Sequence, residues 1–247
     1  MSARMTVLLH LIASPLAAQD AEHVADNSFL IEEAYNQGPG VVQHISTFSW
    51  AEEQASWEYG FTQEWPLGGM RHQLSYTAPL VDPESSGAGL GDVLLSYRYQ
   101  ALGDGRSAVH LAPRLSVVLP TGSRREGRGS GSLGLEANLP LSYVAGDALA
   151  LHSNAGLILH GEAGAVDARL GASGVLRVRR WVNLMLETVW RSDLEDVLLL
   201  NPGLRWAIDL SGDLQVVPGL AYTVAIGPDV PDALFLYLSL EHPFSRR

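Results

Sequence analysis

The sequence predicts an all-β fold, a transmembrane antiparallel β-barrel of about 12 strands that follows an N-terminal non-strand segment. From residue 41 onward, runs of strand length alternate with turn-forming residues, and apolar and polar residues alternate within the runs. No helix-length amphipathic run interrupts them, and after the first residues no stretch of about 18 apolar residues could form a membrane helix. Charged residues make up only 17% of the chain, so a large apolar surface has to be hidden in a core or in lipid.

The alternation is clearest in residues 149–160 and 166–180. Every second residue from Val166 to Val178 is apolar or small, whereas the residues between them include Asp167 and Arg169. Successive side chains of a strand point to opposite faces, so this pattern places an apolar file outside and a polar file inside. An apolar exterior with a polar interior is typical of membrane barrels.

A soluble β-sandwich also shows alternation, but its polar face usually carries many lysines. This chain contains 16 Lys and Arg residues together, and all of them are arginine. The runs of ten or more residues are also long for a sandwich, where strands of about five or six residues are most common. The barrel is therefore the favoured interpretation.

The bulk charge excludes one class of partner. The net charge is −11 and the pI is about 5.1, whereas nucleic-acid binding needs a basic surface. The chain has no cysteine, which excludes disulfide bonds, thiolate metal sites and a cysteine nucleophile.

Residues 1–18 have the pattern of a secretory signal peptide. Arg4 gives a positive start, residues 7–13 are mostly apolar, and the stretch ends in the small pair Ala17 and Ala18. The alternative is a frayed N-terminus of a cytosolic protein.

Residues 19–40 do not resemble a strand. Asn27 is expected to cap a short helical turn that runs to Tyr35, and residues 36–40 would end it. We expect the segment to lie at the periplasmic mouth or to plug the lumen, and residues 41–247 to form the barrel.

The predicted strands are even in number, as in bacterial single-chain barrels. They are residues 41–50, 57–66, 71–80, 92–101, 108–119, 133–143, 149–160, 166–180, 182–191, 196–209, 214–226 and 233–243. Proline removes a ladder hydrogen bond, so prolines inside these runs predict bulges or register breaks. They are Pro113, Pro140, Pro202 and Pro218.

The connections alternate in length. Tight turns such as residues 146–147 and 180–181 contrast with longer connections at 81–91 and 121–132. Short periplasmic turns and longer outer loops are typical of outer-membrane barrels. Arg124, Arg125 and Arg128 would then lie in an outer loop, either in contact with lipopolysaccharide phosphates or simply solvated. The expected partners include outer-membrane lipid and lipopolysaccharide.

Polar residues of the predicted inner files are candidates for a solute path through the lumen. They are Glu58, Glu64, Asp92, Arg98, Arg114, Glu136, His152, Asn154, Arg169, Arg177, Glu187, Arg191 and Arg205. Confined charges have to pair, so one interpretation is a set of salt bridges that closes the lumen. The other is a charged constriction that selects solutes. About 12 strands give a modest bore that side chains and the N-terminal segment can fill.

The trio His152, Ser153 and Asn154 raises the question of a hydrolase. A base has to lie within about 3 Å of its nucleophile, and adjacent strand residues point to opposite faces. Ser153 is predicted to face lipid and His152 the lumen, so no catalytic site is expected. The histidines are scattered along the chain, and we expect neither a metal site nor a cofactor.

Several blocks of sequence resemble a family of outer-membrane transporters that is associated with the MetA pathway of phenol degradation. The blocks are residues 29–37, 40–44, 61–66, 89–93, 97–100, 113–116, 119–122 and 154–156. The resemblance covers most of the chain after residue 18 and implies a β-barrel in the outer membrane of a Gram-negative bacterium. It implies a substrate only loosely and provides no catalytic residue. The chain departs from common barrels at its end, where Phe244 is followed by three further residues.

Together these observations predict an outer-membrane channel or transporter-like protein for small solutes, hydrophobic or aromatic ones among them, without enzymatic activity. Two alternatives stay open. One is a barrel enzyme that acts on lipid, and the other is a structural barrel with a filled lumen.

Overall fold

The structure is a computed structural model that describes residues 28–83, 87–104, 107–161, 164–192, 196–210, 213–228 and 230–244. The predicted signal peptide and Asn27 lie outside the described residues. Within the described part, no helix is long and apolar enough to cross a membrane. The described elements are β1 (Val41–Ala51), β2 (Ser56–Pro66), β3 (His72–Asp82), β4 (Gly89–Leu90), β5 (Val93–Tyr99), β6 (Val109–Leu111), β7 (Arg114–Leu119), η2 (Arg124–Glu126), β8 (Gly134–Ala145), β9 (Leu149–His160), β10 (Val166–Arg179), β11 (Val182–Arg191), β12 (Val197–Trp206), β13 (Ile208–Leu210), β14 (Leu214–Ile226) and β15 (Ala233–Pro243).

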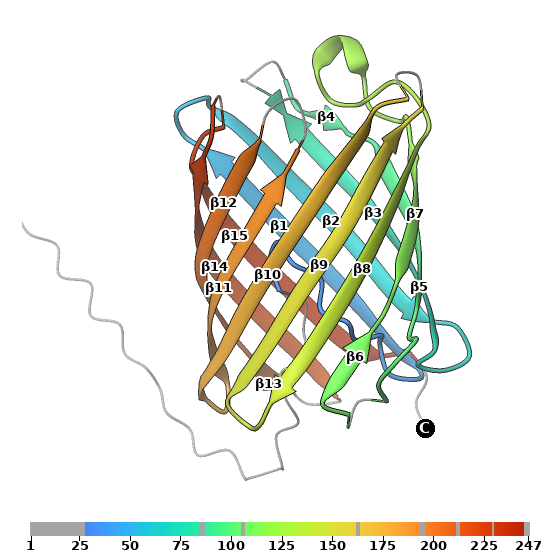
Figure 1. The fold of residues 1–247 in the computed structure, drawn as a ribbon, viewed down its shortest axis with the longest axis vertical. Helices are drawn as coiled ribbons and strands as arrows, with labels where there is room; N and C mark the ends of the chain where they lie inside the picture. Colours follow the sequence, from blue (N-terminus) through green and yellow to red (C-terminus); the bar gives the residue numbers. More distant parts are fainter. Residues whose placement is uncertain are drawn as a thin grey trace, which may run out of the picture.

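The strands close into a single antiparallel barrel (Figure 1). Neighbours in the chain are neighbours in the sheet, and β1 pairs with β15 to complete the ring. β6 and β7 together form one stave of the wall, β12 and β13 form another, and β4 only extends the edge of β3. The wall therefore has 12 staves, as the sequence predicts.

The four prolines inside predicted strands each lie at a gap in one hydrogen-bonded ladder. Pro113 separates β6 from β7, and Pro140 lies opposite the same gap. Pro202 lies in a gap between β12 and β14, and Pro218 lies opposite the gap between β12 and β13. The register is the same on both sides of each gap, so the ladders are interrupted but not shifted. Skipping one pair is sufficient, because proline lacks only its own N–H donor.

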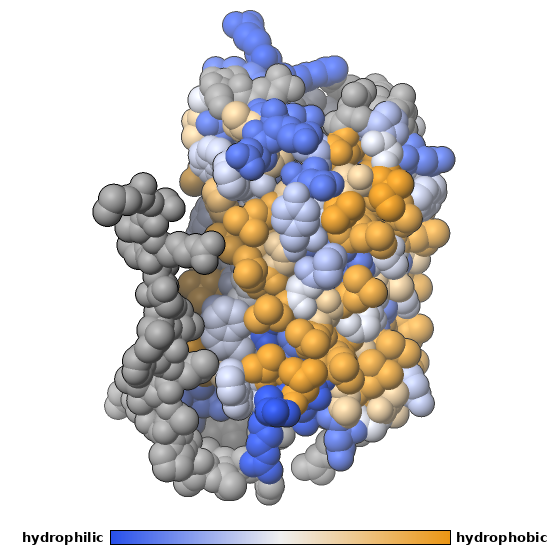
Figure 2. All heavy atoms as spheres, turned by 90° about the vertical axis from the view of Figure 1, so that its left-hand side faces the viewer, coloured by the Kyte–Doolittle hydropathy of each residue, from blue (hydrophilic) through white to orange (hydrophobic). Residues whose placement is uncertain are grey.

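The alternation separates an apolar exterior from a polar interior. Inner-file side chains such as Gln43, Glu187 and Asn201 are fully buried. Figure 2 shows hydrophobic side chains spread over the outer wall between hydrophilic ends. Those exposed on the outer face include Leu95, Leu115, Leu135, Leu139, Leu151, Leu157, Leu170, Leu176, Leu184, Leu186, Leu220, Leu236 and Leu238.

The two ends of the barrel differ, and we name them by their connections. The turn end carries short turns such as residues 146–148, and the last strand finishes there (Figure 1). The loop end carries residues 120–133 with η2. The carboxylate of Asp92 braces this loop, because it accepts the N–H groups of Gly122 at 2.9 Å and Ser130 at 2.7 Å. Asp92 is therefore a loop residue and not the inner-wall residue that the alternation predicts.

Candidate functional site: the occupied lumen

Residues 28–40, which we call the inner segment, lie inside the barrel before the chain turns at Gly40 into β1 (Figure 1). The segment contains no helix, so the predicted helical turn is wrong for residues 28–35. In a helix the backbone N–H groups would bond to carbonyls of the same segment. Here side chains of the barrel wall take most of those N–H groups. The buried residues of the segment are Ser28, Phe29, Ile31, Glu33, Ala34, Asn36 and Gln37.

Two side-chain amides bind the segment as a neighbouring strand would. The Asn154 oxygen accepts the N–H of Glu32 at 2.8 Å, and the Asn154 nitrogen donates to the carbonyl of Glu32 at 2.8 Å. Gln100 accepts the N–H of Asn36 at 2.9 Å and donates to the carbonyl of Ala34 at 2.8 Å. An amide carries one acceptor and one donor group, so it can satisfy both polar groups of a backbone.

Carboxylate, amide and hydroxyl oxygens accept further N–H groups of the segment. Glu187 of β11 accepts those of Leu30 at 2.9 Å and Ile31 at 3.1 Å. Ser142 accepts the N–H of Ala34 at 2.8 Å, and Gln73 accepts that of Gln37 at 2.7 Å. The contacts thus follow the wall in reverse strand order, from β11 through β9, β8 and β5 to β3. Buried backbone groups have to be paired, and here the wall pairs them.

Charged residues of the wall pair with the segment and with one another. The Arg114 guanidinium contacts Glu32 at 2.8 Å and also pairs with Glu136. Arg98 lies 3.5 Å from Glu64, and its Nε donates to Asn36 at 2.8 Å. These pairs favour the interpretation of a lumen closed by salt bridges over that of an open charged constriction.

A second, more deeply buried cluster surrounds Glu33. Its carboxylate accepts the hydroxyl of Ser28 at 2.9 Å and lies 3.1 Å from the Arg205 guanidinium, which is 1% exposed. His152 is 3.8 Å from the same carboxylate and shares a hydrogen bond of 2.7 Å with Ser142. Burial raises the pKa of the nearby Tyr35 hydroxyl above its usual value, and the charge of Glu33 acts in the same direction.

The cluster brings a serine, a histidine and a carboxylate together, but from different residues than the sequence suggests. The hydroxyl beside His152 belongs to Ser142, its partner in the β8–β9 ladder, and Ser153 lies on the outward file. Ser142 is 0% exposed and already accepts the N–H of Ala34. A substrate cannot reach this oxygen, so in this arrangement the trio holds the inner segment.

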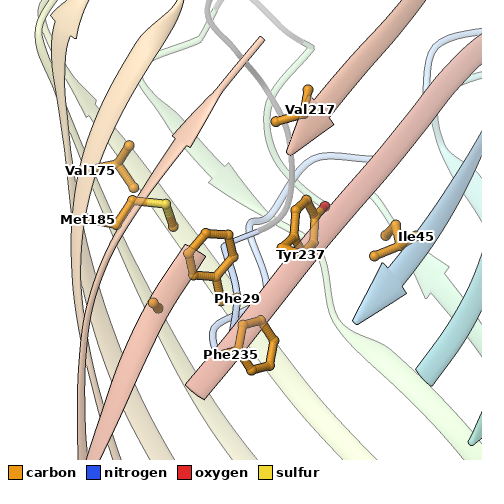
Figure 3. Packing of buried hydrophobic residues seen from close by; sticks show 8 residues of the cluster. Phe29, Ile45, Val175, Met185, Val217, Phe235 and Tyr237 are labelled. Carbon is orange, nitrogen blue, oxygen red and sulfur yellow. The ribbon is translucent and has the colours of Figure 1, made fainter. Parts of the chain in front are cut away.

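Apolar side chains anchor the start of the segment. The Phe29 ring packs against Phe235 and Tyr237, with ring centroids 5.5 and 5.2 Å apart (Figure 3). The ring also lies over Gly203 and Gly219, where a Cβ atom would come within 2.8 and 2.5 Å of it. These glycines leave the recess that the ring fills.

Gly219→Ala is expected to displace Phe29 and loosen the inner segment. Overpacking a well-packed site costs about 1–3 kcal/mol, so we expect the segment to expose itself roughly tenfold more often. The chain has no cysteine, so a thiol introduced by Ile31→Cys, at a residue 2% exposed, can report exposure through its rate of maleimide labelling.

The matched control is Gly174→Ala, where the new Cβ would meet only Leu151, at 3.8 Å. Adding Phe29→Ala to Gly219→Ala should relieve the clash that displaces the ring. Equal labelling of the Gly219 and Gly174 variants would contradict the anchoring role of the recess.

The remaining predicted residues lie away from the segment. Glu58 is exposed on β2, and Arg177 is half-buried near the turn end of β10. Arg169 is exposed, and Arg191 lies opposite it in the β10–β11 ladder. The structure therefore brings seven candidates into contact with the segment or its immediate charge partners. They are Glu64, Arg98, Arg114, Glu136, His152, Asn154 and Glu187, with Arg205 on Glu33.

The neutral hydrogen-bonding residues of the wall are missing from the predicted set. Gln73, Gln100 and Ser142 contact the segment as directly as the charged residues do. Their position on inner files is visible in the alternation. A search for polar residues of any charge at these positions would have found them.

Above the segment, toward the loop end, a cavity of about 50 Å³ remains. Leu30, Ile31 and Glu32 form its floor, and Arg114 and Arg169 are among its walls. A water needs about 10–15 Å³ by this measure, so the cavity holds a few waters and no larger solute. The occupied lumen provides no wide path through the barrel.

A closed antiparallel barrel with an apolar outer face and a polar interior defines an outer-membrane β-barrel protein. The family described as "Putative MetA-pathway of phenol degradation" matches residues 37–179, and the chain belongs to this family. The match begins at Gln37, so it contains the barrel strands up to β10 but only the end of the inner segment. The resemblance noted in the sequence is thereby confirmed.

Solved structures share the fold at low sequence identity. The COG4313 outer membrane channel from Pseudomonas putida F1 has a TM-score of 0.60 and 14% identity, over 85% of this chain and 98% of that one. The KdgM porin has a TM-score of 0.57 and 7% identity, over 82% and 99%. The NanC porin has a TM-score of 0.57 and 10% identity, over 81% and 100%. No curated protein matches the chain in sequence.

Proposed function

We propose that the protein is an outer-membrane channel for small solutes, hydrophobic and aromatic ones among them, which conducts when the inner segment moves. The turn end faces the periplasm in this proposal. The loop end faces outward, where Arg124 and Arg125 of η2 meet lipopolysaccharide phosphates. The barrel carries out no chemistry of its own, and the Ser142–His152 pair serves to hold the segment.

The observation that carries the proposal is that the inner segment is not part of the wall. The ring closes through the pairing of β1 with β15, and the segment adds no strand to it. Side-chain hydrogen bonds and ion pairs hold the segment, and each such hydrogen bond contributes only about 0.5–1.5 kcal/mol, because water can replace it. The segment can therefore leave while the barrel stays closed. Membership of the family and the likeness to proteins named as channels and porins support the same function.

A structural barrel without transport is the second candidate. The small cavity of about 50 Å³ favours it, because the lumen as it stands admits no solute of drug or sugar size. The two candidates differ in whether the segment is displaced in the membrane.

Permeation through the reconstituted protein separates the two. Liposomes that contain the folded barrel are expected to take up phenol and glycerol faster than protein-free liposomes, and to exclude the trisaccharide raffinose. Folding is checked by heat-modifiable migration in detergent gels. Uptake equal to that of protein-free liposomes for every solute would contradict the channel and favour the structural barrel.

A further inference from the structure

Two arginines face each other across neighbouring strands above the inner segment. Arg169 of β10 and Arg191 of β11 are direct partners in the ladder. Arg169 lines the cavity above the segment, and Arg191 shares the inner file of Val189, which lines the same cavity. Directly opposite residues have Cβ atoms about 4.5–5.5 Å apart, and like charges in this position destabilise a sheet. An anion between the two guanidinium groups would remove that repulsion.

The carboxylates of the surrounding wall are already engaged elsewhere. Asp167 lies 2.7 Å from His160, and Glu136 pairs with Arg114. Arg169 is exposed and makes no side-chain hydrogen bond or ion pair with any described residue. Its planar guanidinium therefore remains available to a carboxylate, which it can bind through two parallel hydrogen bonds.

The residues around the pair are apolar. Ile158 and Val189 line the cavity beside Arg169, and Leu199 is the ladder partner of Val189. The cavity of about 50 Å³ is too small for a ring, so the body of a ligand would lie on its loop-end side, against these side chains. A cationic pair among apolar side chains fits a ligand with one negative charge and a compact apolar body.

We infer that Arg169 and Arg191 form a recognition site for small monocarboxylates with an apolar body, aromatic carboxylates among them. The inference rests on the proposed channel function for its purpose, because it assigns a substrate class to the same lumen. The site lies above the inner segment, so binding does not require the segment to move.

Direct binding tests the site without any transport. Wild-type protein in lipid nanodiscs is dialysed to equilibrium against radiolabelled benzoate, with benzyl alcohol as the uncharged analogue and acetate and inorganic phosphate as anions without an apolar body. We expect saturable benzoate binding that weakens at least about tenfold in Arg169→Ala, as the loss of a charge-assisted hydrogen bond predicts. Arg169→Lys should be intermediate, because it keeps the charge and loses the planar fork.

The control variant is Arg179→Ala, which removes an exposed arginine from the end of the same strand and leaves the same net charge. Unchanged benzoate binding in Arg169→Ala, in protein that still shows heat-modifiable migration, would overturn the site. Equally tight binding of benzyl alcohol would overturn the role of the charge, and equally tight acetate or phosphate would overturn that of the apolar body. If benzoate binds through Arg169 but no solute permeates liposomes, the channel proposal fails and the binding site stands. If solutes permeate and benzoate does not bind, the reverse holds.

Discussion

A variant that lacks residues 28–37 is expected to form open pores in planar bilayers with a conductance on the order of tenfold above that of the wild type. The deleted residues contribute the buried side chains that fill the lumen, whereas the pairing of β1 with β15 does not involve them. Eight strands give an interior that side chains alone can fill, and 16 to 18 leave an aqueous channel. A barrel of 12 staves lies between these cases, so its bore depends on what occupies it.

The control replaces the same ten residues with a Gly/Ser segment of equal length. It keeps the chain length before β1 and removes every side chain that binds the wall. We expect this variant to conduct as the deletion does. A Gly/Ser variant as closed as the wild type would show that the side-chain contacts are not what occupies the lumen, and an equally closed deletion would refute the plug altogether.

Glu33→Ala is expected to have the largest effect of any single substitution in the inner segment. The change removes the carboxylate that lies 3.1 Å from Arg205 and accepts the hydroxyl of Ser28. Breaking a buried ion pair costs about 3–5 kcal/mol, so labelling of a cysteine introduced by Ile31→Cys should accelerate by about 100-fold or more.

Two further variants control for charge and shape. Glu53→Ala removes an exposed carboxylate in the turn between β1 and β2 and should leave the labelling rate unchanged. Glu33→Gln keeps the shape without the charge and should give an intermediate rate. The Glu33 cluster would not be the principal anchor if Glu33→Ala labelled no faster than Glu53→Ala.

The wall of the barrel is predictable from the sequence because its signals are local. Alternation over ten or more residues and the turns between runs place the strands within a few residues of their observed bounds, for example residues 149–160 for β9. The same alternation assigns Ser153 to the outside and His152 to the lumen. The gaps at the prolines could be anticipated, but not their unchanged register, because register depends on the partner strand.

The path of the inner segment could not be predicted from local pattern. Its bonds join residues far apart in the chain, such as Leu30 to Glu187, which are separated by 157 positions. The contact of Ser142 with His152 likewise appears only when the register of β8 against β9 is known. The segment also lacks a partner strand, so its extended form depends on side chains that reach it from the wall. Read alone, residues 27–35 resemble the start of a helix, and this interpretation fails for that reason.

The order of contacts along the inner segment determines how it can be withdrawn. Phe29 contacts β15, Ile31 binds β11, Glu32 binds β9, Asn36 binds β5 and Gln37 binds β3. A pull on the end that begins at Ser28 would load these contacts one after another, whereas a hinged lid would have to break all of them at once. Each released stave exposes a further sector of the bore, so the opening passes through graded levels of conductance and requires only a small force at any one step.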